Sequence, residues 1–411
     1  MFGAFSILSL VGIAHTVLAQ NPAAEKVVFN FTATTGYYPS GVIRDAIGNL
    51  YIATELGGNN QDCTDGCGNI LKLSHPAGKA TVLYTFGPSG EGLEGPNPSG
   101  LVRDAMGNLY GATAYGGTTF YAGTVFKLTP SGKKETLHNF AGGDDGLQPL
   151  GGVTIDSAGN LYGTTEYGGG TGCGGSGCGV VYEVTPSGSE TILYSFTGGI
   201  DGAQPQASPI LDASGNLYGT ALEGGDLTCP LESGIGCGTA WKLDTSGNLT
   251  VLYSFTGSTD GAAPGAGLTM DSSGNLYGDA VAGGDLSCDP PVGCGVVFEI
   301  NSSGNFAVLH TFTGGPDDGE APFATLLRDT NGNLYGTTVE GGNQFCESGC
   351  GIVFKLNASG NETILHAFTG GTTDGEYPVG PLITNGTATL YGTTGYGGLA
   401  NGGVVFAVQA R

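Results

Sequence analysis

Charged side chains are scarce in this sequence, and basic ones are the scarcest. Only 12% of the 411 residues are Asp, Glu, Lys or Arg, which excludes a coiled coil or a set of long charged helices. Lys and Arg number 12 against 36 Asp and Glu, so the formal net charge is −24. Because binding to nucleic acid or to an anionic membrane surface needs a basic face, the composition disfavours both as partners, and we expect neither.

Long apolar runs are also missing, except at the N-terminus. Residues 2–19 are largely apolar and end in Val17, Leu18 and Ala19, a pattern typical of a secretory signal peptide cleaved near Ala19 and Gln20. No later stretch approaches about 18 consecutive apolar residues, the length needed to span a bilayer. We therefore expect residues 1–19 to be a signal peptide and residues 20–411 to form a single secreted domain without a membrane span.

Glycine is abundant, with 80 copies beside 19 prolines, but it follows no three-residue rule, which excludes collagen. The glycines recur in phase with an Asn-Leu-Tyr motif, which becomes Thr-Leu-Tyr in its last copy and returns at intervals of about 52 to 59 residues. This interval suits a small sheet of four short strands. The tyrosines of the seven copies are Tyr51, Tyr110, Tyr162, Tyr218, Tyr277, Tyr335 and Tyr391.

Each repeat contains four short β-type runs separated by turn signals. In the second copy the runs cover residues 101–103, 108–113, 124–129 and 135–140. Small residues just before the first turn, such as Gly151, Ala207 and Ala266, mark the first run as the innermost strand, where strands crowd around an axis. Seven such units predict an all-β fold, a seven-bladed β-propeller of four-stranded blades.

The two ends of the chain predict how the ring closes. The last copy has a third run at residues 403–408 and no fourth run after it. Residues 26–31 resemble the fourth run of another repeat, residues 191–196. We therefore expect the N-terminal strand to complete the last blade and to remove an exposed sheet edge.

Ten cysteines fall in pairs within the loops between the second and third runs. Two repeats lack both members of the pair, so the partners are present or absent together. This pattern predicts a disulfide within each loop and an oxidising, extracellular compartment. Zinc binding is the alternative, because several spacings resemble zinc knuckles, but no histidine lies beside any pair. The expected pairs are Cys63 with Cys67, Cys173 with Cys178, Cys229 with Cys237, Cys288 with Cys294, and Cys346 with Cys350.

The repeated Asp-x-x-Gly-Asn-Leu-Tyr segment, residues 156–162 in the third copy, has two interpretations. In a hairpin, the Asp side chain caps a turn and the glycine takes the left-handed conformation. A calcium loop would need carboxylates at alternate positions, where these turns carry Ala, Ser, Thr or Met. The hairpin is the favoured interpretation.

A second acidic feature, usually an Asp-Gly pair, recurs between the outer strand of one blade and the inner strand of the next. If these carboxylates point to the axis, they ring one mouth of the propeller and attract a cation such as Ca²⁺ or a basic partner. If they do not, the Asp-Gly pair only forms a turn, and this is the favoured interpretation. We therefore expect no cofactor firmly. The candidate residues are Glu91, Asp145, Asp201, Asp260, Asp318 and Asp374.

Exposed aromatic residues are the other binding candidates. Tyr115, Tyr167 and Tyr396 precede a Gly-Gly pair in loops on the same face, where they either stack on sugars or pack against the glycines. No Ser or Cys nucleophile has an evident base and acid partner, and no histidine cluster has metal spacing.

The remaining histidines and arginines give weaker signals. His138, His310 and His366 occupy an outer-strand position that is Tyr in other repeats, so we interpret them as packing residues. Three arginines close to the turn after the innermost strand, Arg44, Arg103 and Arg328, are the residues on which an enzyme would depend.

Residues 179–199 read Gly-Val-Val-Tyr-Glu-Val-Thr-Pro-Ser-Gly-Ser-Glu-Thr-Ile-Leu-Tyr-Ser-Phe-Thr-Gly-Gly. This segment resembles the GloVer tandem repeat of secreted bacterial "choice-of-anchor" proteins, and the resemblance covers nearly all of residues 25–411. The Asp-x-x-Gly-Asn-Leu-Tyr part more weakly resembles NHL and gluconolactonase-like propeller repeats. The GloVer resemblance implies an exported repeat protein and brings no catalytic residues with it.

These observations together predict a binding or scaffold module rather than an enzyme. We expect a monomer that is secreted or held at the cell surface, where its loops meet a glycan or a protein. One rival is a propeller lyase or hydrolase acting on a polysaccharide or lactone. Another is a purely structural surface protein without a ligand.

Overall fold

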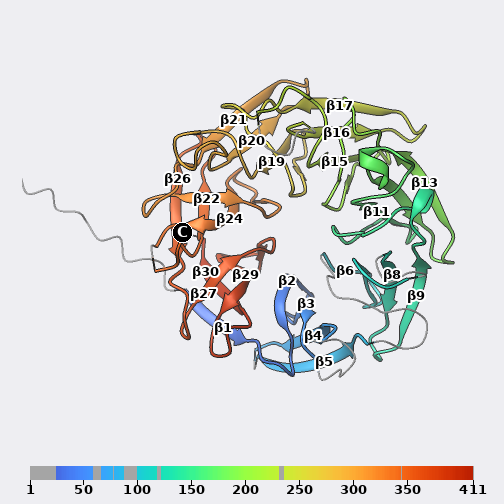
Figure 1. Ribbon diagram of the computed structural model, residues 1–411. Coiled ribbons are helices and arrows are strands. Elements are labelled where there is room, and N and C mark those ends of the chain that lie inside the picture. Colours follow the sequence, from blue (N-terminus) through green and yellow to red (C-terminus); the bar gives the residue numbers. More distant parts are fainter. Residues whose placement is uncertain are drawn as a thin grey trace, which may run out of the picture.

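The computed structural model describes residues 25–58, 66–76, 78–87, 100–117, 122–230, 236–343 and 345–410. Over these ranges the strands form seven antiparallel sheets arranged around a central axis (Figure 1). Each sheet carries four strands from the axis outward, in chain order except that the N-terminal strand is the outermost strand of the seventh sheet. The sixth and seventh sheets have one additional short strand. The predicted seven-bladed β-propeller is therefore confirmed.

Blades are numbered in chain order, and their strands run as follows. Blade 1 has β2 (Tyr37–Arg44), β3 (Leu50–Leu56), β4 (Asn69–Ser74) and β5 (Lys79–Thr85). Blade 2 has β6 (Val102–Arg103), β7 (Leu109–Thr113), β8 (Thr124–Leu128) and β9 (Lys134–Asn139), and the 3-10 turn η1 (Gly143–Asp145) follows. Blade 3 has β10 (Thr154–Ile155), β11 (Leu161–Thr165), β12 (Val180–Val184) and β13 (Glu190–Ser195), with the 3-10 turn η2 (Cys173–Gly175) in its loop.

The other four blades repeat this order. Blade 4 has β14 (Ile210–Leu211), β15 (Leu217–Ala221), β16 (Thr239–Leu243) and β17 (Leu249–Ser254). Blade 5 has β18 (Thr269–Met270), β19 (Leu276–Ala280), β20 (Val296–Ile300) and β21 (Phe306–Thr311). Blade 6 has β22 (Gly319–Pro322), β23 (Leu327–Arg328), β24 (Leu334–Gly341), β25 (Ile352–Leu356) and β26 (Glu362–Ala367). Blade 7 has β27 (Gly375–Pro378), β28 (Ile383–Thr384), β29 (Thr389–Gly397), β30 (Val404–Gln409) and β1 (Lys26–Asn30).

The ring closes through the N-terminal strand. β1 pairs antiparallel with β30, with Lys26 opposite Ala407 and Asn30 opposite Val404. The next residue, Phe31, is 0% exposed and donates its N–H to the carbonyl of Gly403 at 3.1 Å. The expected closure is therefore confirmed, and the N-terminal strand removes the free edge that β30 would otherwise expose.

The core lies between blades rather than within them. The fourth strand of one blade supplies a Phe whose ring meets the third-strand aromatic of the next; Phe255 and Phe298, for example, have centroids 5.2 Å apart. The second strand makes room for that ring with a glycine. A Cβ added to Gly278 would lie 2.6 Å from Cζ of Phe298, which explains why Gly follows Leu-Tyr in six of the seven repeats.

The turn between the first and second strands is a self-contained polar network. In blade 2 the Asp104 carboxylate accepts hydrogen bonds from the backbone N–H of Asn108 at 2.8 Å, its side-chain amide at 2.7 Å and the hydroxyl of Tyr110 at 3.1 Å. Burial opposes ionisation here, but these bonds lower the pKa of Asp104 below its ordinary value. The Asp, Asn and Tyr side chains of the motif thus hydrogen-bond to one another, as the hairpin interpretation predicts.

A glycine and a proline join successive blades. A Cβ added to Gly238 of blade 4 would lie 2.5 Å from Cδ of Pro264, which begins blade 5. The residue before this proline, Ala263, has a φ of 55° and donates its N–H to the carbonyl of Cys237 at 2.9 Å. The same joint recurs at ring closure, where Pro39 lies against Gly403, and there it positions Tyr38 beside the central channel.

Disulfides close the loops between the second and third strands. Each of four loops contains one bridge, which confirms four of the five expected pairs. Cys67 is also disulfide-bonded, whereas Cys63, its expected partner, lies outside the described residues, as does the expected signal peptide. Such disulfides indicate an extracellular location. No helix within the described ranges is long and apolar enough to cross a membrane.

Candidate binding site at the mouth of the central channel

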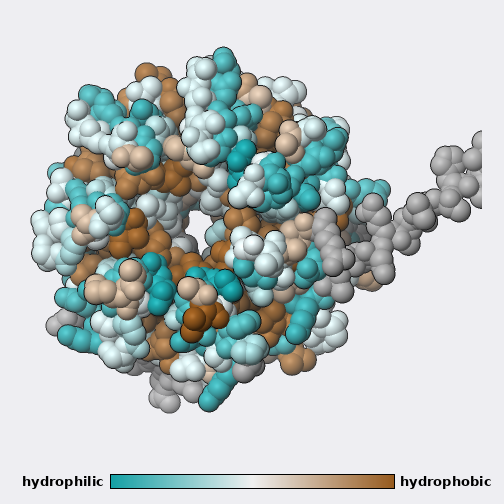
Figure 2. All heavy atoms as spheres, turned by 180° about the vertical axis from the view of Figure 1, so that it is seen from behind, coloured by the Kyte–Doolittle hydropathy of each residue, from teal (hydrophilic) through white to brown (hydrophobic). Residues whose placement is uncertain are grey.

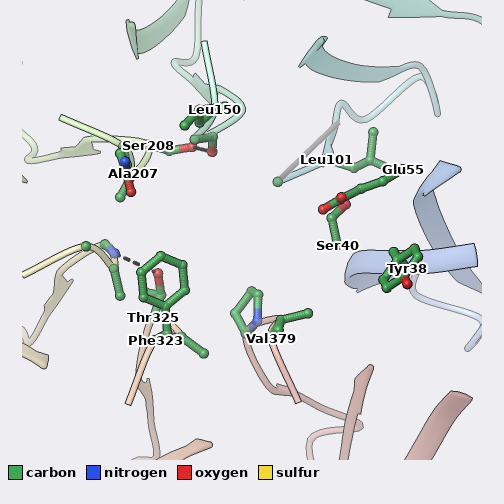
Figure 3. Close-up of a pocket in the computed structure, with 18 of the residues that line it drawn as sticks. Tyr38, Ser40, Glu55, Leu101, Leu150, Ala207, Ser208, Phe323, Thr325 and Val379 are labelled. Atoms are coloured by element: carbon green, nitrogen blue, oxygen red, sulfur yellow. Dashed lines mark hydrogen bonds between the residues drawn. The ribbon is translucent and has the colours of Figure 1, made fainter. Parts of the chain in front are cut away.

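A cavity of about 930 Å³ lies at the centre of the ring. All seven blades contribute to its wall through the innermost strand or the segment that leads into it, and blades 1, 2 and 7 also through residues at or just after the end of the second strand. Figure 2 shows the opening on one face, bordered largely by hydrophobic residues, and Figure 3 shows the side chains that project into the cavity. The cavity has the size of a small-molecule or oligosaccharide site.

The wall is made of small residues, as the sequence predicts for the innermost strands. Gly151, Ala207 and Ala266 all line it. The strands approach so closely that a Cβ added to Gly151 would lie 2.4 Å from the backbone of Ala207. Small side chains therefore keep the channel open while seven strands crowd around it.

Aromatic side chains gather at the mouth. Tyr38 and Tyr396 meet edge to face with centroids 4.7 Å apart, and Tyr377 lies 5.6 Å from Tyr396. These three tyrosines come from blades 1 and 7, on either side of the ring closure. Phe323 of blade 6 is 39% exposed and faces the same space (Figure 3). Tyr115 of blade 2 lines the cavity as well.

The sequence identified part of this aromatic set. Tyr115 and Tyr396 line the cavity, whereas Tyr167 is not among the described residues that line it. Tyr38, Tyr377 and Phe323 were missed. The sequence feature that could have identified them is the repeated proline. Tyr38 and Tyr377 immediately precede this proline, and Phe323 immediately follows it.

Polar groups on the wall are few and lack positive charge. Glu55 and Ser40 of blade 1 both project toward the cavity (Figure 3). Burial raises the pKa of Glu55 to about 7. On blade 4, Gln206 donates its amide N–H to Oε1 of Glu166 at 3.0 Å. Among the described lining residues there is no histidine, lysine or arginine.

The Asp-Gly carboxylates lie elsewhere, beside the outer strands. Asp201 accepts hydrogen bonds from the hydroxyl of Tyr194 at 3.0 Å and the N–H of Thr197 at 2.8 Å, both within its own blade. The other described members make equivalent contacts, and none of the described members lines the cavity: Asp145, Asp260, Asp318 and Asp374. Glu91 lies outside the described residues. The structure therefore places these carboxylates in turns, and ligand binding by them stays a prediction.

The repeated arginines lie at the opposite end of the innermost strands from the mouth. Arg103 stacks over the ring of Tyr51 at 5.7 Å. Arg328 stacks over Tyr277 at 5.1 Å and pairs with Asp271 at 3.5 Å. These arginines join neighbouring blades, and like Arg44 they are absent from the described cavity wall. The residues on which an enzyme would have depended are thus used in packing.

Comparison with known proteins gives a family and a fold. The family model described as "Gloeobacter/Verrucomicrobia repeat" matches residues 15–230 and 228–411. No curated protein matches the chain.

Solved structures share the architecture at low sequence identity. Virginiamycin B lyase from Staphylococcus aureus, a catalytically inactive histidine-to-alanine variant with quinupristin, is 13% identical, with a TM-score of 0.58 over 94% of this chain and 99% of that one. The extracellular domain of a putative one component system from B. thetaiotaomicron is 14% identical, with a TM-score of 0.52 over 93% of this chain and 40% of that one. At these identities the likeness shows the fold alone.

Proposed function

This chain belongs to the Gloeobacter/Verrucomicrobia repeat family, and we propose that it is an exported binding module whose central cavity takes a neutral oligosaccharide. The observation that carries the proposal is the aromatic mouth of a cavity walled by all seven blades. Export is supported by the loop disulfides and by the N-terminal apolar segment, and sequencing the N-terminus of the exported protein tests it. Cleavage between Ala19 and Gln20 is expected.

A sugar fits this mouth for two reasons. The C–H faces of pyranose rings pack on aromatic rings, and Tyr38, Tyr377 and Tyr396 form a continuous aromatic surface. Sugar hydroxyls also need a few well-placed donors and acceptors, which Glu55 and Gln206 supply. The net charge of −24 and the lack of a cation in the described wall disfavour anionic glycans.

A glycan array followed by calorimetry tests the proposal on oxidised, mature protein. We expect binding to neutral oligosaccharides, and we expect Tyr396→Ala to weaken it by about tenfold or more. Tyr167→Ala is the matched control, because Tyr167 occupies the same loop position as Tyr396 but is not in the described cavity wall. Equal losses in both variants, or no binding to any neutral glycan, would refute this function.

Catalysis is the second candidate function, and Glu55 is the observation that favours it. A carboxyl group with a pKa of about 7 inside a cavity is suited to general acid–base chemistry near neutral pH. A lyase or hydrolase acting on a polysaccharide or lactone would then depend on this residue. The enzyme is supported if the native protein turns over a substrate and Glu55→Gln abolishes turnover but keeps binding. The binding module is supported if the native protein binds without turnover.

A further inference from the structure

Three clusters at the outer rim each combine one histidine, one aspartate and one glutamate. We call them the rim triads. In each, one ligand atom from every side chain lies within 4.8 Å of the other two. Their members are His138, Asp145 and Glu190; His310, Asp318 and Glu362; and Glu25, His366 and Asp374.

Each rim triad bridges two blades. In the first, His138 is on β9 of blade 2, Asp145 is in the turn that follows, and Glu190 begins β13 of blade 3. The imidazole Nε2 of His138 lies 3.2 Å from Oδ1 of Asp145 and 3.5 Å from Oε2 of Glu190. In the second, the corresponding distances from His310 are 3.4 Å and 3.9 Å.

These separations match the edges of a small coordination tetrahedron. Zinc binds imidazole nitrogen and carboxylate oxygen at about 2.0–2.2 Å, which places neighbouring ligand atoms about 3.3–3.5 Å apart. In the first rim triad the two distances from the imidazole, 3.2 Å to Asp145 and 3.5 Å to Glu190, are close to this spacing. Its aspartate is also held in place, because the other oxygen of Asp145 accepts the N–H of Ala141 at 2.5 Å.

The glutamate of every rim triad has a buried oxygen without a partner. Oε1 of Glu25, Glu190 and Glu362 is inaccessible to solvent and makes no hydrogen bond within the described chain. A bound cation would compensate this buried, incompletely partnered carboxyl group.

The residue types vary together from blade to blade. Glutamate lies at the start of the outer strand of the next blade, or directly before it in the case of Glu25, in the three places where the preceding blade has His, and in none of the other four. Where the preceding blade has Tyr, other contacts replace the triad: Lys134 lies over Tyr84 at 5.9 Å, and Phe306 stacks on Tyr253 at 3.7 Å. A histidine needed only for packing would not require a glutamate opposite it.

We propose that each rim triad binds one divalent transition-metal ion, with zinc as the best fit, and so fastens two neighbouring blades. Imidazole together with carboxylates suits zinc and its neighbours, whereas calcium takes oxygen ligands alone. Three protein ligands leave a fourth position for water. The function proposed for the central cavity does not enter this argument.

Equilibrium dialysis against zinc tests the proposal on tag-free, oxidised protein first stripped with chelator. We expect up to three zinc ions per chain and a rise in the melting temperature of several degrees. His138→Tyr replaces the histidine with the residue that blades 1, 3 and 4 carry, so folding is expected to survive, and the zinc content should fall by one. Tetrahedral Co²⁺ absorption should fall in proportion.

Blade 3 offers the matched gain of function. It has Tyr194 and Asp201, with Leu249 opposite, and therefore lacks both the histidine and the glutamate. We expect the double variant Tyr194→His with Leu249→Glu to bind one additional zinc ion, and Tyr194→His alone to bind none. The proposal is wrong if the native protein and a His138→Tyr, His310→Tyr, His366→Tyr triple variant take up equal zinc.

Discussion

Asp279 provides the sharpest test of how the blades are held together. It lies on β19, is 1% exposed, and neither oxygen of its carboxyl group has a hydrogen-bond partner in the described chain. Four other repeats carry threonine at this position. The hydroxyl of Thr220 donates to the carbonyl of Ala266 in the next blade at 2.8 Å, and Thr164 makes the same contact with Ala207. The hydroxyls of Thr337 and Thr393 have no partner in the described chain.

The pH dependence of Asp279 follows from its burial. Burial raises its pKa well above the ordinary value. The folded protein therefore keeps a proton that the unfolded chain releases near its ordinary pKa of 3.8. Stability is fully present below that value and falls as the pH rises toward the raised pKa of the folded state.

We expect Asp279→Thr to stabilise the protein, because the hydroxyl can donate to Ala324 as Thr220 does to Ala266. Removing an orphaned buried polar group and adding one hydrogen bond is worth about 1–3 kcal/mol near neutral pH. Denaturant unfolding at about pH 5 and about pH 8 measures it, and the gain should be larger at the higher pH.

Asp279→Asn is the control, since it keeps the shape of the side chain but cannot ionise. It should remove the pH dependence without restoring the full stability of the threonine variant. If Asp279→Thr is less stable than the native protein at about pH 8, or if its pH dependence is unchanged, then Asp279 has a partner that this reasoning omits.

Three further predictions concern the ring, its joints and its cavity. Phe31→Ala should lower the free energy of unfolding by about 3–5 kcal/mol in thermal or denaturant melts, because Phe31 is fully buried in the closing blade. A variant of unchanged stability would mean that the N-terminal strand does not close the ring. Gly238→Ala should lower the free energy of unfolding by more than about 3 kcal/mol, because its Cβ would meet Pro264. Gly304 has a φ of 84° and open space around it, so Gly304→Ala should lower that free energy by only about 1–2 kcal/mol. Equal losses would contradict the proposed joint. Burial raises the pKa of Glu55 to about 7, so its ionisation should lower the free energy of unfolding by about 3 kcal/mol as the pH rises from 4.5 to about 7. Glu55→Gln should abolish this loss, which denaturant unfolding at both ends of the pH range measures. An unchanged pH profile in the variant would show that Glu55 titrates normally.

The histidines show where interpretation of single positions falls short. The sequence predicts that His138, His310 and His366 are packing residues, and each does contact a phenylalanine ring edge to face. The interpretation was incomplete, because each also meets two carboxylates. The signal was present in the sequence as a joint occurrence of His in one repeat and Glu at the start of the next outer strand, but it appears only once the repeats are compared in pairs.

The Asp-Gly pairs show the converse. The sequence left open whether their side chains point to the axis or into turns. Hydrogen bonds such as that from Thr197 to Asp201 place the described members in turns. The direction of a side chain on a loop depends on contacts with its own outer strand, which spacing along the chain does not reveal.

The sequence by itself determined the number of blades, the order of strands within them and the closing role of residues 26–31. These features follow from local turn chemistry and from the periodicity of one repeated unit, and both are written along the chain. Only the tertiary structure decided which side chains meet around the channel and along the rim. Tyr38 and Tyr396 stand at opposite ends of the sequence, and Glu25 meets His366 across the closure, because the curvature of a closed ring brings distant repeats into contact.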